Sequence, residues 1–211
     1  MNRIIRIFSV LALLSGLVTL TAGVSMASPK AGSSYSLNGW AGYSWPDGSG
    51  NWAAADFTVP HFGSPDGAVA FWAGLGRGNP GIQQDGVSCG WANGVTSCNA
   101  WYEMWPASPH AFGYRVEPGD HMRFIVLRFG TRYVLKVVNY TRAWTARTIQ
   151  YSSDVEYSGE AIAEAFGPEP PGFTAASFSR TSGAISNLYS WPFGGEYSVP
   201  DGSYSFTIHR T

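Results

Sequence analysis

The sequence predicts an all-β fold in which two antiparallel sheets pack as a β-sandwich. Short segments rich in β-branched and aromatic residues recur along the chain, and turn residues separate them, including 26 Gly and 13 Pro among 211 residues. Several segments alternate apolar and polar side chains, as strands with one buried face do. No segment repeats with a period of about 20–50 residues, which excludes a solenoid. Charged residues make up 13% of the chain and aromatic residues 15%, and this composition excludes disorder.

The N-terminus, residues 1–27, is predicted to be a signal peptide. Arg3 and Arg6 precede an apolar run at residues 7–24, and small residues then suit cleavage by a signal peptidase after Ala27. A membrane anchor is the alternative, but polar residues interrupt the run, so export is favoured. We therefore expect a secreted protein that has no membrane contact once the signal is removed.

The mature chain is predicted to consist of a short polar lead, residues 28–37, and one domain, residues 38–211. It has 11 basic and 14 acidic residues, and this net charge of −3 offers no basic surface to nucleic acid. The four histidines are scattered, so we expect no metal site, and we expect no cofactor. We also expect a monomer.

The first half of the domain contains four predicted strands. Aromatic and glycine residues open it at residues 38–43, and residues 53–60 alternate side chains between two faces before a proline ends the strand. Residues 68–75 are continuously apolar, as in a buried strand, and residues 82–87 follow a glycine-rich turn. Residues 100–106 place three aromatic strand formers around one carboxylate.

The second half begins with the clearest hairpin of the chain. Residues 121–129 and 133–140 are joined by a short turn, and residues 147–151 suit a further strand. Residues 159–166 are ambiguous, because their Glu and Ala content favours a helix whereas the alternation of the two favours a strand. We choose the strand. Three more strands complete the prediction, at residues 173–178, 184–190 and 204–209.

The reactive groups that the sequence offers are carboxylates. Cys89 and Cys98 lie close together in a chain expected to be exported, so we predict a disulfide that closes a short loop and leaves no free thiol. A Ser-His-Asp triad has no Gly-x-Ser-x-Gly motif to support it. Glu103, Glu160 and Glu164 lie on apolar or aromatic strands, where burial would raise their pKa values.

Three functions are compatible with such carboxylates. In a strand, Trp101, Glu103 and Trp105 share one face, which suits the binding of an extended polymer such as a polysaccharide. Two facing carboxylates are typical of a glycosidase. A carboxylate opposite an amide is typical of a hydrolase in which the acid activates water and the amide stabilises the oxyanion. The residues by themselves leave these possibilities open.

Seven segments occur in the order in which the eqolisins, the glutamic peptidases, carry them, and the chain resembles this family over residues 38–166. The run Trp101-Tyr102-Glu103 matches a motif of the family closely, and residues 82–87 are similar to the segment with its catalytic glutamine. The seven segments are Gly39–Tyr43, Phe57–Pro60, Ala70–Leu75, Ile82–Val87, Ala100–Glu103, Pro118–Asp120 and Gly159–Glu164.

The resemblance implies a concanavalin-like jelly roll of two seven-stranded sheets, with a polypeptide substrate lying across the concave sheet. Glu160 would act as general base toward the attacking water and then as acid toward the leaving amine. Gln84 would stabilise the tetrahedral intermediate through its amide. Trp72, Trp101 and Glu103 would line the site and bind the substrate.

Glu164 is a further substrate-binding candidate, and because it shares a strand face with Glu160 it is also the alternative base. An acidic pH optimum is expected, because one carboxyl must begin protonated or share a proton. The rival functions are a polysaccharide-binding sandwich without catalysis and a glycosidase that uses Glu103 with Glu160 or Glu164.

The chain departs from the family pattern at several positions. Gly76 or Arg77 stands where the family usually has an aspartate, Ser88 stands where it often has another, and Ala161 replaces a tryptophan that usually follows the catalytic glutamate. Fungal members carry a long propeptide, whereas here only residues 28–37 separate the cleavage site from the domain. The short lead argues against a zymogen stage. The resemblance is to a secreted, bacterial-type member of the family.

Overall fold

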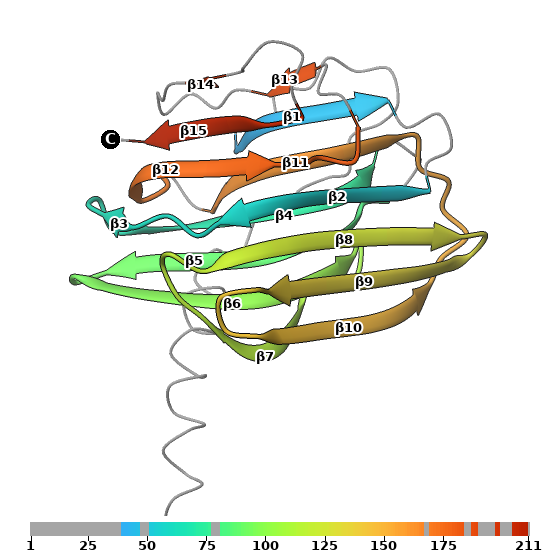
Figure 1. The fold of residues 1–211 in the computed structure, drawn as a ribbon, viewed down its shortest axis with the longest axis horizontal. Coiled ribbons are helices and arrows are strands. Elements are labelled where there is room, and N and C mark those ends of the chain that lie inside the picture. Colours follow the sequence, from blue (N-terminus) through green and yellow to red (C-terminus); the bar gives the residue numbers. More distant parts are fainter. Residues whose placement is uncertain are drawn as a thin grey trace, which may run out of the picture.

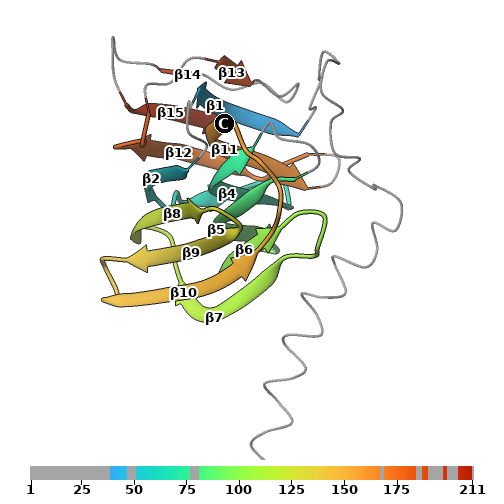
Figure 2. The same cartoon turned by 90° about the vertical axis from the view of Figure 1, so that its right-hand side faces the viewer.

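The computed structural model describes residues 39–46, 51–76, 81–166, 169–183, 187–189, 197–198 and 204–210. The predicted signal peptide and nearly all residues before β1 lie outside the described residues. Within those ranges the regular structure consists of strands, which form two antiparallel sheets packed face to face (Figures 1 and 2). The predicted all-β antiparallel sandwich is confirmed.

One sheet, sheet A, carries the predicted site residues. Its strands lie in the spatial order β13-β1-β11-β4-β5-β6-β7. Their bounds are β13 (Asn187–Tyr189), β1 (Trp40–Pro46), β11 (Ser158–Phe166), β4 (Gly67–Gly76), β5 (Gln83–Ala92), β6 (Val95–Met104) and β7 (His110–Val116).

The other sheet, sheet B, has the order β10-β9-β8-β2-β12-β15-β14, and β3 pairs with β12 beside this path. Its strands are β10 (Trp144–Tyr151), β9 (Arg132–Asn139), β8 (His121–Phe129), β2 (Trp52–Thr58), β12 (Gly172–Ser179), β15 (Phe206–Arg210), β14 (Tyr197–Ser198) and β3 (Phe62–Gly63). The expected seven strands are found in sheet A, whereas β3 adds an eighth to sheet B within the described part of the chain.

The core between the sheets is built from the inward faces of both. Phe57 of sheet B stacks on Phe71 of sheet A with 4.7 Å between ring centroids, and Phe124 and Phe178 lie 5.5 and 4.9 Å from Phe57. All four rings are at most 1% exposed. Removing one such ring would cost about 3–5 kcal/mol of stability.

A buried carboxyl joins the two sheets through this core. Asp85 of β5 accepts hydrogen bonds from the backbone amides of Ile125 in β8, at 3.1 Å, and Lys136 in β9, at 2.6 Å. Burial raises the pKa of Asp85 well above its usual value, although the two backbone hydrogen bonds act in the opposite direction. Asp85 follows Gln84 directly, so the alternation of β5 places it on the opposite face of sheet A.

The predicted disulfide between Cys89 and Cys98 is present. The two residues are direct partners in a long hairpin rather than the ends of an irregular loop. The turn of this hairpin is Asn93-Gly94, and both residues have a positive φ, of 52° and 80°, as a tight hairpin turn requires. Asn-Gly is the strongest short hairpin signal, and reading it would have extended both predicted strands to the turn.

Other strand predictions have mixed outcomes. Residues 159–166 are a strand, β11, which pairs with β1 on one side and β4 on the other. Pairing on both sides explains why the alternation outweighs the helix propensity of Glu and Ala. The strand β7 was not predicted, because prolines precede it and a glycine interrupts it. Of the predicted strand at 184–190, only β13 lies within the described residues.

Neither a spanning helix nor a metal cluster is found in the described ranges. No helix there has the length and apolarity needed to cross a membrane. Likewise, no three His, Cys, Asp or Glu side chains in that part of the chain are grouped so that they could hold a metal ion.

Candidate active site

Five neighbouring strands of sheet A bring a carboxyl, an amide and a second carboxyl into one row. Glu160 of β11 pairs with Gly74 of β4, Gly74 pairs with Gln84 of β5, and Gln84 pairs with Glu103 of β6. Ser44 of β1 flanks Glu160 on the other side. Neighbouring strands lie about 4.8 Å apart, so the backbones of Glu160 and Gln84 are roughly 10 Å apart. The residue between them is glycine, and no side chain separates the two functional groups.

The next two rows of the same face are mostly apolar and aromatic, although the second of them includes Glu164 and Ser88. Ile162, Trp72, Gly86 and Trp101 are successive partners across β11, β4, β5 and β6. In the row after that, Trp40, Glu164, Ala70 and Ser88 are successive partners. Trp40, Ala70, Trp72, Trp101 and Ile162 form a cluster of their own, separate from the core between the sheets.

This face therefore looks away from sheet B, and we call it the outer face of sheet A. All six residues that the sequence predicted as catalytic or substrate-binding lie on it: Gln84, Glu160, Trp72, Trp101, Glu103 and Glu164. None of them is more than 8% exposed. Trp105, which strand alternation would add to this face, lies instead in the turn that begins after β6 ends at Met104, where Pro106 follows.

Glu160 is positioned by small neighbours. The hydroxyl of Ser158 donates to its Oε1 at 3.3 Å. A Cβ placed on Gly76 would lie 3.0 Å from the Cδ, Oε1 and Oε2 atoms of Glu160, so the carboxyl lies directly over this glycine. A side chain at Gly76 would displace the Glu160 carboxyl as it is placed in this chain.

Gln84 is held by Glu103 of β6, on the side of Gln84 that faces away from Glu160. Its Nε2 donates to Oε2 of Glu103 at 2.5 Å, while its Oε1 is buried and has no hydrogen-bond partner among the described residues. A Cβ on Gly74 would lie 3.0 Å from Cβ of Gln84 and 3.2 Å from the Trp72 ring. Gly74 therefore lets Gln84 and Trp72 pack closely over the backbone of β4.

Glu164 is engaged by tryptophans. The indole of Trp72 donates to Oε2 of Glu164 at 3.0 Å, and the Trp40 ring meets the Trp72 ring edge-on with 4.9 Å between centroids. Burial raises the pKa of Glu164, and hydrogen bonds from Trp40 and Trp72 oppose that rise. Glu164 lies two rows away from Gln84, so Glu160 is the carboxyl that shares a row with the amide.

The carboxyl of Glu103 is easily protonated. Its pKa is raised to about 7, mainly by burial and also by the nearby charge of Glu164, while the hydrogen bond from Gln84 acts in the opposite direction. The outer face thus combines an amide with carboxyls in surroundings of low polarity, where hydrogen bonds to developing charge are strong.

Several residues of this face escaped the sequence prediction as site residues. Trp40, Ser158 and the glycines Gly74 and Gly76 all contact predicted site residues. The glycines had a detectable signal, since they occupy alternate positions at the end of an apolar strand, where glycine marks close approach of another group. Two other positions at which the chain departs from the family pattern lie away from the row of Glu160 and Gln84. Ser88 is two rows from Gln84, and Ala161 is fully buried in the core between the sheets.

Solved structures share this fold. A scytalido-glutamic peptidase in complex with a transition state analog inhibitor superposes with a TM-score of 0.68 and 18% identity, over 82% of this chain and 98% of that one. SCP-B, described as a member of the eqolisin family and bound to the tripeptide Ala-Ile-His, gives 0.63 and 16% over the same shares. Aspergilloglutamic peptidase from Aspergillus niger gives 0.52 and 22%, over 68% of this chain and 99% of that one.

No curated protein sequence matches the chain. The model of the Peptidase A4 family, however, matches residues 38–191, which include every strand of sheet A and the whole cross-strand row. With nearly three quarters of its length covered by that match, the chain belongs to the peptidase A4 family.

Proposed function

We propose that this peptidase is a secreted acid endopeptidase in which Glu160 is the general base and Gln84 stabilises the oxyanion. One observation carries the proposal: Glu160 and Gln84 lie in the same cross-strand row of sheet A, with only a glycine between them. A peptide bond above Gly74 would have the carboxyl on one side and the amide on the other. Membership of the family supports the same assignment.

The polar atoms of the outer face suit an extended peptide. Oε1 of Gln84 and Nε1 of Trp101 are both buried without hydrogen-bond partners among the described residues. An unsatisfied buried polar atom costs about 1–3 kcal/mol, so a ligand that supplies both a donor and an acceptor gains free energy there. A peptide backbone supplies both, and Trp72 and Ile162 offer an apolar surface to its side chains.

The reaction uses these groups in two stages. Glu160 takes a proton from water as the water attacks the peptide carbonyl, and an N–H of Gln84 donates to the oxygen that becomes negative. Glu160 then passes the proton to the leaving amine, so the carboxylate is regenerated. One lost oxyanion donor typically lowers the rate by about 10²–10³.

The glycosidase alternative fits the row less well. Glycosidases place their two carboxyls about 5–9.5 Å apart across the scissile bond. Glu103 and Glu160 are three strand spacings apart, roughly 14 Å between backbones, and the amide of Gln84 lies between them.

The choice of Glu160 over Glu164 rests on the same row. Secretion and the monomeric state are also proposals, and they rest on the sequence.

The test is cleavage of an acid-denatured protein from about pH 2 to about pH 7 by the mature chain and its variants. Glu160→Gln and Gln84→Ala should each lose at least about 10²-fold in kcat while remaining folded by circular dichroism. Gln150→Ala is the matched control, since it removes an amide of sheet B that contacts Tyr102 and Thr148 rather than the row. It should cleave at the wild-type rate.

Other outcomes separate the alternatives. Loss of activity in Glu164→Gln but not in Glu160→Gln would move the base along the same strand and refute the assignment of Glu160. A folded wild type that cleaves no protein at any pH would refute the peptidase function. If that protein then binds a polysaccharide and Trp101→Ala does not, the chain is the non-catalytic binding sandwich.

A further inference from the structure

We propose that Glu103 is a positioning residue that sets which way the amide of Gln84 faces, and that gain or loss of the Glu103 proton turns this amide over. The inference rests on the proposed function, because it explains how Gln84 is prepared for its role. It goes beyond that function by assigning to Glu103 an action on Gln84 rather than on the substrate.

The contact between the two side chains is isolated. Gln84 and Glu103 are direct cross-strand partners, and they are 5% and 8% exposed. The bond from Nε2 to Oε2 of Glu103 is the only hydrogen bond that the side-chain amide forms with the described residues. The terminal torsion of a glutamine is soft, so it does not fix the amide plane by itself. Glu103 is therefore the group that orients the amide.

The two protonation states of Glu103 require opposite orientations. A carboxylate can only accept, so it must face the Nε2 hydrogens, and Oε1 is then turned away from it, as in the structure. A carboxylic acid has one O–H to donate, and it can donate to Oε1 if the amide rotates by half a turn. Both Nε2 hydrogens are then free to face a substrate oxygen. The oxygen and nitrogen ends of an amide are nearly the same size, so the rotation needs no repacking.

The orientation of the Gln84 amide beside a protonated Glu103 is the one that the reaction needs. An oxyanion is stabilised by donors and repelled by the lone pairs of Oε1. The proton moves only between the solvent and Glu103, and no bond of Gln84 is made or broken. Protonation of Glu103 therefore prepares the site for catalysis in acid, and ionisation turns the acceptor toward the substrate.

The charges around Glu103 favour its protonated form. On β11, β4 and β5, within the described residues, the titratable groups of this face are Glu160 and Glu164 of β11, whereas Gly74, Trp72 and Gln84 of β4 and β5 carry no charge. Burial and the charge of Glu164, opposed by the hydrogen bond from Gln84, together raise the pKa of Glu103 to about 7. The carboxyl therefore exchanges its proton near neutrality.

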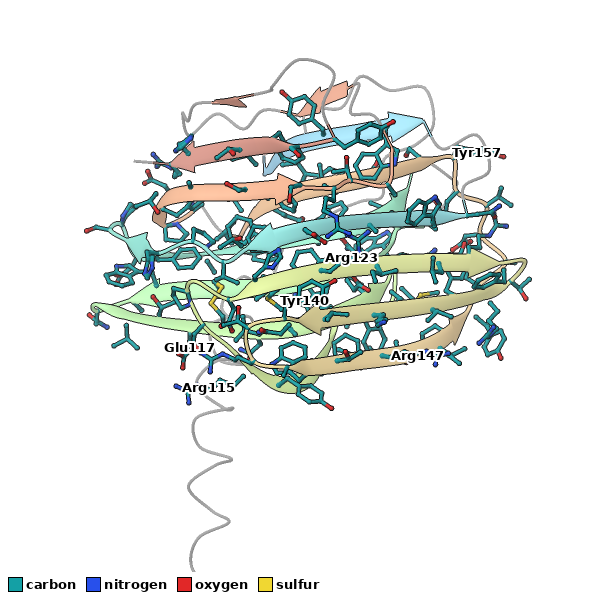
Figure 3. All side chains as sticks on the ribbon, in the orientation of Figure 1. Arg115, Glu117, Arg123, Tyr140, Arg147 and Tyr157 are labelled. Atoms are coloured by element: carbon teal, nitrogen blue, oxygen red, sulfur yellow. A yellow bond between two sulfur atoms is a disulfide. The ribbon has the colours of Figure 1, made fainter. Side chains whose placement is uncertain are left out.

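The edge strand β7 supplies no close cation to this carboxyl. His110 stacks on Tyr102, with 5.2 Å between ring centroids, and Tyr102 belongs to the opposite face of β6. Arg115 is the partner of Asn99, two rows away, and it forms an ion pair with Glu117 at the β7 edge (Figure 3). None of the ion pairs of the described residues includes Glu103, so no paired cation holds its carboxyl ionised in acid.

The first experiment follows the amide directly. The side-chain ¹⁵N–¹H signals of Gln84, assigned by their loss in Gln84→Ala, should change with a midpoint near neutral pH in the wild type. In Glu103→Gln this titration should disappear, because a glutamine at position 103 can donate to Oε1 at every pH. A Gln84 signal that titrates in Glu103→Gln as it does in the wild type would overturn the proposal.

The second experiment is the pH profile of kcat and KM. Glu103→Gln should move the alkaline fall of kcat upward by at least about one pH unit. Glu103→Ala should lower kcat by roughly 10- to 100-fold with little change in KM, because Gln84 remains but is no longer oriented. An alkaline fall at the wild-type position in Glu103→Gln, or full kcat in Glu103→Ala, would refute the inference.

The control is Asp85→Asn, which removes another buried carboxyl from the strand that carries Gln84. Asp85 faces sheet B, so the alkaline fall should stay where it is in the wild type. A shift in this variant would mean that the fall reports loss of folding, and the proposal would fail. If Gln84→Ala itself retains full activity, the proposed function fails. If Gln84→Ala is inactive but the Glu103 variants behave as the wild type, only the present inference fails.

Discussion

Replacing Gly76 by alanine should impair catalysis without impairing the fold. The added Cβ would lie 3.0 Å from three atoms of the Glu160 carboxyl, which are its three nearest neighbours. The carboxyl is the far end of a flexible side chain, so it would move rather than the strand. The variant therefore tests the placement of Glu160 while leaving Glu160 itself in place.

The magnitude follows from this contact. Ordinary contacts of a Cβ lie at about 3.4–4.0 Å, so the carboxyl must move by roughly 0.4–1.0 Å, and a displacement of about 1 Å can lower a rate by about 10²-fold. We expect kcat to fall by about 10- to 100-fold. The unfolding free energy should stay level or rise by up to about 1 kcal/mol, because alanine loses less backbone entropy on folding than glycine.

The assay compares kcat on a denatured protein substrate in acid, with the melting temperature measured in the same buffer. Gly63→Ala is the matched control, since a Cβ at Gly63 meets nothing within 4 Å. Gly63 lies in β3, at the side of sheet B. If kcat of Gly76→Ala stays within about threefold of the Gly63→Ala value, the Glu160 carboxyl is not the base that this geometry describes.

Two further predictions concern stability. Burial raises the pKa of Asp85, of Glu164 and, to about 7, of Glu103, so between about pH 4 and these raised values the folded chain binds more protons than the unfolded chain. The unfolding free energy should therefore be highest in acid and fall as the pH rises toward 7, by roughly 3 kcal/mol for Glu103 alone. Urea unfolding at a series of pH values checks this, with a smaller fall in Glu103→Gln, and a stability that rises with pH would contradict it. Replacing Cys89 and Cys98 together by serine should cost less than about 3 kcal/mol in the same assay, because the bond spans only nine residues and the Asn-Gly turn already holds the hairpin closed. A larger loss would mean that the hairpin does not form without the bond.

The strand pattern and the faces of the strands were predictable from the sequence. Alternation alone put Glu160 and Glu164 on one face of their strand, and Trp101 and Glu103 on one face of theirs, because side chains in a strand alternate with a period of two. The Asn-Gly turn was equally readable, although it was missed. The roles of Gln84 and Glu160 came from resemblance to a family, since neither an isolated glutamine nor an isolated glutamate indicates chemistry by itself.

The tertiary structure decided which strands are neighbours and in which register they pair. Glu160 lies far along the chain from Gly74 and Gln84, and only the pairing of β11 with β4 puts it in one row with them and with Glu103. A slip of one residue would turn every one of these side chains to the other face, so long-range pairing rather than local propensity builds the site.

The distinction among buried carboxyls also belongs to the tertiary structure. Asp85 and Glu103 both lie on predicted strands, and both have raised pKa values. Asp85 is bonded to the backbone of sheet B inside the core, whereas Glu103 is bonded to Gln84 on the outer face. The sequence determines that these residues lie on strands, but their chemistry depends on the groups that the second sheet and the neighbouring strands bring within hydrogen-bonding distance, because burial and partners together set the charge of a carboxyl.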